Sequence, residues 1–61
     1  MTKVGDTVEL VSTTDQYTRL EPGERGVVTF VDSVGTVHVK WESGSTLGLV
    51  PGEDAWKVVK P

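Results

Sequence analysis

Apolar and polar residues alternate most clearly in the middle of the chain. Apolar residues recur at every second position, at Val37, Val39 and Trp41, with polar residues between them. This is the period of a β-strand with one face in the core and the other in water. The preceding run, Arg25–Val31, is apolar on both faces, which predicts a central or strongly bent strand. The residues between the two runs, 32–35, are typical of a tight reversal, so this region is predicted to form a β-hairpin.

Three further strands are expected, over residues 7–11, 45–49 and 55–60. No stretch of ten residues shows the apolar repeat of an α-helix. The pattern therefore predicts an all-β fold, a small, partly open five-stranded barrel. Six apolar side chains are expected to fill its interior: Val28, Val37, Val39, Trp41, Leu47 and Leu49.

The connections between the strands differ in length. Residues 12–23 form a long first loop that ends in the turn signal Pro22-Gly23, and such loops are more often functional or folded onto the core than idle. Gly26, inside a strand, predicts a bulge or a close approach of two backbones. A second Pro-Gly pair, Pro51-Gly52, interrupts the sheet, and a short helical turn of the 3₁₀ type is expected there before the last strand.

Length and composition limit the function. The 61 residues allow one domain, over 1–61, with a thin stability margin and little room for a catalytic cleft. Without Cys, and with His38 as the only His, no metal centre or other cofactor is expected. No apolar run resembles a signal peptide or a membrane span, which favours a cytoplasmic protein. We expect a complete small protein, although an excised domain would show the same pattern.

Two motifs together resemble SH3-like barrels, including the KOW modules of transcription and ribosomal proteins. They are the run 22–28, with Pro22-Gly23 and Gly26, and the run 37–45 around Trp41. The chain from residue 5 to 59 is also similar to a family of small uncharacterised domains from bacteria and their phages. The positions that carry this second resemblance include Tyr17, Leu20 and Trp56. Both resemblances imply a fold and leave the activity open, because such barrels serve many functions.

A binding surface for a protein or peptide is the first functional hypothesis. Exposed aromatic and polar residues are expected to form it: Tyr17, Arg19 and Leu20 from the long loop, with Pro51 and Trp56. The alternative is that Leu20 and Trp56 close the end of the barrel and Tyr17 lies over it. No catalytic residues accompany this set, so the hypothesis is a non-enzymatic module, such as a phage-derived accessory or host-modifying factor.

Nucleic-acid binding, implied by the resemblance to KOW modules, is the alternative. Basic side chains would contact phosphates: Arg19, Arg25, Lys40 and Lys57, with Lys60. Tyr17 or Trp56 would stack on a base. The formal net charge of −3 opposes this hypothesis unless the basic residues gather on one face.

The remaining candidates have simpler explanations. Trp41 is expected in the core, and His38 points outward as a solvated strand residue. Acidic residues near the loops could attract a basic partner, but capping of a turn is the preferred role for Asp54. A homo-oligomer could form through an apolar edge that includes Val27, Val31 or Val34.

Overall fold

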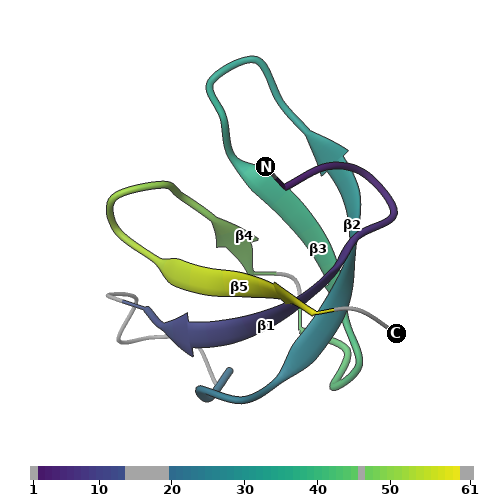
Figure 1. Cartoon of the computed structure of the whole chain (residues 1–61), viewed down its shortest axis with the longest axis vertical. Helices are drawn as coiled ribbons and strands as arrows, with labels where there is room; N and C mark the ends of the chain where they lie inside the picture. Colours follow the sequence, from purple (N-terminus) through teal and green to yellow (C-terminus); the bar gives the residue numbers. More distant parts are fainter. Residues whose placement is uncertain (1, 14–19, 46, 60–61) are drawn as a thin grey trace.

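Five antiparallel strands form one sheet, in a computed structural model that describes residues 2–13, 20–45 and 47–59 (Figure 1). The strands are β1 (Thr7–Ser12), β2 (Arg25–Val31), β3 (Val37–Trp41), β4 (Gly48–Leu49) and β5 (Ala55–Val59). Their order across the sheet is β4-β3-β2-β1-β5. The described residues contain no helix, which confirms the all-β prediction. They also contain no helix with the length and apolar character that crossing a membrane requires.

The sheet is open, and one of its strands is shorter than predicted. Among the described residues β4 and β5 do not pair, so the sheet is open between its two edge strands. The strand expected over residues 45–49 is reduced to Gly48–Leu49, because Gly44 ends a tight turn at a φ of +88° and pairing with β3 begins only at Gly48. Thr46 lies outside the described residues.

One layer of apolar side chains fills the concave face of the sheet. Eight of them are buried: Val8, Leu10, Leu20, Val28, Val37, Val39, Trp41 and Leu49. Five of the six predicted interior residues are among them, and the sixth, Leu47, packs against the cluster as a partly buried residue. The Trp41 indole Nε1 donates a hydrogen bond to the Leu47 carbonyl oxygen over 2.8 Å. Trp41 is therefore a core residue, as the alternation predicted.

Gly26 lets β2 and β3 approach closely. It lies opposite Val8 on one side and Trp41 on the other. A Cβ atom at this position would stand 2.5 Å from Val39 Cγ1 and 2.7 Å from the Lys40 carbonyl oxygen. The predicted close backbone approach is thus present, and it leaves no space for a side chain. A bulge follows between Val28 and Phe30, which changes the register of β2 against β3.

Candidate functional site

The turn before β5 is a Pro-Gly turn rather than the expected 3₁₀ turn. Glu53 N donates to the Val50 carbonyl oxygen over 3.1 Å, and Gly52 has a φ of +91°. A positive φ at the third residue, after Pro51, is the signature of a type II turn and cannot belong to a right-handed helix. The prediction of a helical turn was therefore wrong, because the glycine conformation reverses the chain within four residues.

Asp54 joins this turn to the start of the long loop. Its Oδ2 accepts a hydrogen bond from Val50 N over 2.9 Å, which closes the turn. Its Oδ1 accepts another from Thr13 Oγ1 over 2.6 Å. The capping role preferred for Asp54 is present, and the same carboxylate fixes the first residue of the loop against the turn. Pro51 lies exposed within this turn and forms an isolated β-bridge with Asp54.

Trp56 is only half-buried. It lies opposite Leu10 in the pairing of β1 with β5 and packs against the edge of the core. Its indole Nε1 donates to Thr2 Oγ1 over 2.9 Å, so the start of the chain contacts this strand. Part of the ring remains open to solvent, which leaves it able to serve both as packing and as a contact surface.

The long loop contributes one described member of the predicted surface. Leu20 is 4 % exposed and belongs to the core, so its side chain offers almost no area to a partner. This position fits the alternative in which Leu20 closes the end of the sheet. Tyr17 and Arg19 lie outside the described residues. Among the predicted peptide-site residues, Pro51 is exposed and Trp56 partly exposed, whereas Leu20 is buried.

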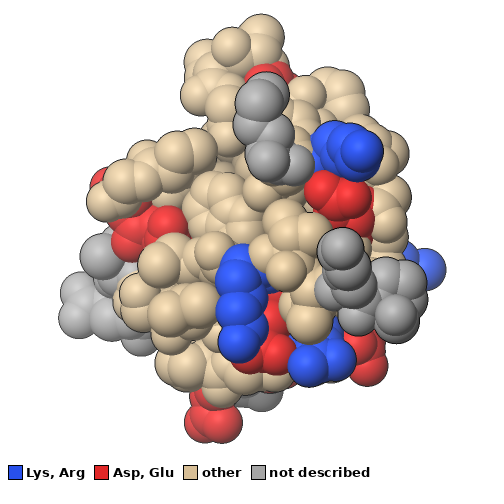
Figure 2. All heavy atoms as spheres, viewed as in Figure 1, with Lys and Arg blue, Asp and Glu red and all other residues tan. Residues whose placement is uncertain are grey.

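Three of the predicted phosphate-binding residues share the convex face of the sheet. Arg25 and Lys57 lie on either side of Glu9 in the cross-strand register, with Arg25 Nε at 2.9 Å and Lys57 Nζ at 3.4 Å from its carboxylate oxygens. The hydrogen bond from Arg25, assisted by Lys57, holds the pKa of the Glu9 carboxyl below its ordinary value. Lys40 lies on the same face, opposite Val27. In Figure 2, basic and acidic side chains are interspersed and form no single basic patch on the face shown. Arg19 and Lys60 lie outside the described residues.

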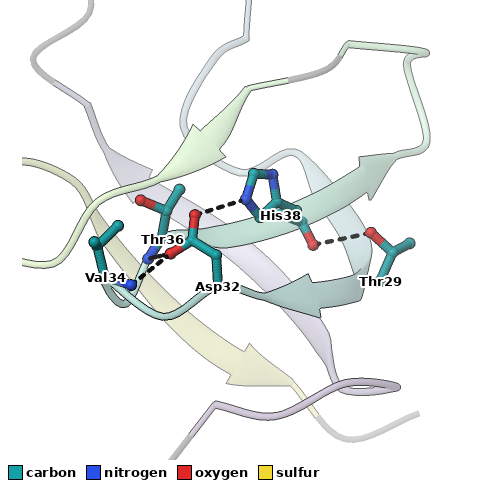
Figure 3. Close-up of polar contacts among 5 residues, drawn as sticks. All are labelled: Thr29, Asp32, Val34, Thr36 and His38. Carbon is teal, nitrogen blue, oxygen red and sulfur yellow. Dashed lines mark hydrogen bonds and ion pairs between the residues drawn. The ribbon is translucent and has the colours of Figure 1, made fainter.

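His38 contacts the turn that joins β2 to β3. Its Nε2 lies 3.1 Å from Asp32 Oδ2, and the second carboxylate oxygen accepts the backbone amides of Val34 and Thr36 (Figure 3). The His38 hydrogen bond, followed by these two amides, lowers the pKa of Asp32. The ring also lies 5.7 Å from that of Phe30. His38 is exposed as predicted, but it is engaged by neighbours rather than simply solvated.

The three apolar residues named for a homo-oligomer edge differ in exposure. Val34 is 84 % exposed at the tip of the β2–β3 turn, and Val27 projects from the convex face. Val31 packs against the core. Among the described residues no group of three or more His, Cys, Asp or Glu side chains could hold a metal ion.

Two contacts in this region were not anticipated from the sequence. They are the hydrogen bonds from Thr13 to Asp54 and from Trp56 to Thr2, which join residues 41 and 54 positions apart. No local motif reports such pairs. The contact of Asp32 with the Val34 amide did have a sequence signal, because an Asp in a turn commonly accepts the amide two residues later.

Comparison with known proteins adds the family to this description. No curated protein and no solved structure matches the chain. Residues 2–59 match the family described as Domain of unknown function (DUF4314), and this match includes all five strands and the turn before β5. The chain belongs to this family of small domains of unknown function.

Proposed function

We propose that this domain is a small, non-enzymatic interaction module that binds a protein or peptide at the end formed by the long loop and the turn before β5. The hydrogen bond between Thr13 and Asp54 is the observation that carries the proposal. It places the start of the loop beside the turn that carries Pro51. The loop that bears Tyr17 and Arg19 therefore begins next to the turn that carries Pro51, and Trp56 follows that turn in β5.

The chemistry of this region suits a peptide. Pro51 is exposed on a turn held by Asp54, and Trp56 keeps part of its ring open to solvent. Rigid apolar groups provide contact area at a low cost in conformational entropy. Tyr17 would add a second aromatic ring and Arg19 a planar group with several hydrogen-bond donors. The acceptors of a peptide backbone or a carboxylate are natural partners for such a donor set.

The proposed fold is a partly open SH3-like barrel. The strand order β4-β3-β2-β1-β5 and the bulge in β2 support this assignment, as does the strong coiling of the sheet in Figure 1. The resemblance to bacterial and phage domains supports a cytoplasmic accessory or host-modifying factor.

Peptide selection followed by matched substitutions tests the function. A random-peptide library is selected against the immobilised full chain, and the affinity of the recovered peptides is measured by calorimetry. We expect saturable binding that Tyr17→Ala and Arg19→Ala each weaken about tenfold or more. Val34→Ala is the control, because Val34 is 84 % exposed at the tip of another turn. A library that yields no saturable ligand, or ligands indifferent to both loop substitutions, would refute the proposal.

Nucleic-acid binding is the second candidate, because Arg25, Lys40 and Lys57 lie on the same face of the sheet. Glu9 weakens this case, since its carboxylate already contacts two of the three. Short single-stranded RNA and DNA are titrated at several salt concentrations, with Lys40→Ala as the variant. Affinity that falls steeply with salt, and falls further in the variant, would favour this candidate. No binding at low salt would eliminate it.

A further inference from the structure

The two edges of the sheet are protected to different degrees. The edge strand β4 has two residues and is followed closely by Pro51, which lacks a backbone donor. The other edge strand, β5, has five residues and contains neither Pro nor Gly. Within the described part of the chain, β1 is the only strand to which β5 is hydrogen-bonded. Short strands, Pro and charged side chains, Lys above all, are common ways to block an edge against pairing. Strand β5 is not short and has no Pro, and Lys57 is its one charged residue.

Apolar side chains of β5 remain partly exposed at this open edge. Val58 and Trp56 lie on the core face, opposite Val8 and Leu10 of β1. Val8 and Leu10 are buried, whereas Val58 is 47 % exposed and Trp56 is half-buried. An added strand would cover both side chains in the way that β1 covers their other flank.

We propose that an extended segment of a partner protein adds to the free edge of β5 as a sixth strand, with side chains that alternate apolar, acidic, apolar. This inference rests on the proposed binding function and names its mode. Charge complementarity determines the middle residue, because Lys57 lies between the two apolar positions along the strand, projects from the convex face and is 60 % exposed. A carboxylate directly across from it would form a favourable cross-strand pair.

The pairing of β1 with β5 already displays this pattern. Its three central cross-strand pairs are Val8 with Val58, Glu9 with Lys57, and Leu10 with Trp56. The Glu9 carboxylate is 3.4 Å from Lys57 Nζ, so one ammonium group would lie between two carboxylates. A second copy of this chain is a poorer occupant. An antiparallel pair of β5 strands that uses the whole strand places Lys57 opposite Lys57, and like charges in that position repel.

A peptide copy of β1 is the probe. The acetylated and amidated peptide DTVELVS, the sequence of residues 6–12, is titrated into the ¹⁵N-labelled full chain at low salt, and amide shifts are recorded. We expect saturable binding with the largest shifts in Ala55–Val59. Replacing the peptide's Glu by Lys should weaken binding about five- to tenfold, because an attraction becomes a repulsion. Lys57→Gln should abolish the preference for the Glu peptide over the Lys peptide. Lys40→Gln is the matched control, because it makes the same change in β3, two strands away from β1, and it should preserve the preference.

Several outcomes would overturn the inference. The first is that the peptide shows no saturable binding. The second is that the largest amide shifts lie in β2 and β1, which would indicate that the peptide replaces β1. The third is that the preference for the Glu peptide over the Lys peptide survives Lys57→Gln. Concentration-dependent sedimentation of the chain alone, abolished by changes in β5, would make a second copy the occupant. If library-selected peptides bind through Tyr17 and Arg19 while Lys57→Gln has no effect on them, the edge inference fails and the proposed function stands. If neither the library nor the β1 peptide binds, both fail.

Discussion

Gly26→Ala tests the close packing of β2 against β3. The new methyl group would lie 2.5 Å from Val39 Cγ1, 2.7 Å from the Lys40 carbonyl oxygen and 2.8 Å from Trp41 Cα. Two of these three atoms belong to the backbone, so the strands must separate rather than a side chain rotate. Overpacking of this kind costs about 1–3 kcal/mol, and the backbone contacts favour the upper end. Ala also restricts the unfolded chain more than Gly does, which favours the folded state by roughly 0.4–1 kcal/mol. A net destabilisation of about 2 kcal/mol is therefore expected.

That loss is large for a chain of 61 residues, whose total stability is on the order of 3–9 kcal/mol. Thermal unfolding followed by circular dichroism should show a melting temperature about 8–16 °C lower. Gly48→Ala is the matched control, because its closest contact is the Thr36 methyl at 3.1 Å and its closest backbone atom lies at 3.8 Å. It should cost less than about 1 kcal/mol. A Gly26→Ala protein that melts within two or three degrees of the original would refute the packing argument.

Three other predictions follow from single contacts. Asp54→Ala removes the acceptor for Thr13 and for a turn amide, and should destabilise by about 2 kcal/mol in urea unfolding, whereas Asp54→Asn should lose less. Trp41→Phe leaves a small cavity and an unpaired carbonyl group, and should cost about 2–3 kcal/mol by the same assay. The lowered pKa of Asp32, caused first by His38, contributes stability that is complete above the ordinary carboxyl pKa and is lost as pH falls through the lower, folded-state pKa. The free energy of unfolding of Asp32→Asn should therefore depend less on pH below about pH 4 than that of the original chain. Equal slopes of this free energy against pH in the two proteins would contradict this.

The strands with strict alternation could be predicted well from the sequence. Arg25–Val31 has the predicted bounds, and the apolar positions of β3 are all buried. The last strand begins at Ala55 as predicted. These predictions succeed because a period of two directly reports which side chains enter the core. The short β4 and the turn at Gly52 were mistaken because one glycine with positive φ decides each of them, and a pattern of apolar residues does not report backbone conformation.

Less of the candidate site than of the strands could be predicted from the sequence. Pro51 could be placed on an exposed turn, because Pro-Gly pairs form turns wherever they occur. The burial of Leu20 and the bond from Thr13 to Asp54 depend on how the ends of a long loop meet the sheet. Such contacts between segments 40 or more positions apart leave no local signal.

The distribution of charge explains why the net charge of this domain is a poor guide to the ligands that it could bind. In the described strands the basic residues Arg25, Lys40 and Lys57 outnumber the single acidic residue, Glu9. The other described acidic residues lie in the connections between strands.

Four of these acidic residues accept hydrogen bonds from backbone amides of their own turns: Asp6, Glu24, Asp32 and Asp54. Much of the negative charge thus serves to close turns. A net charge of −3 therefore does not exclude an anionic ligand from the convex face of the sheet. What opposes such a ligand there is Glu9, because its carboxylate lies between Arg25 and Lys57 and offsets one of their two positive charges. Lys57 also lies on the edge strand β5, where the strand proposed to add there would place a carboxylate opposite it.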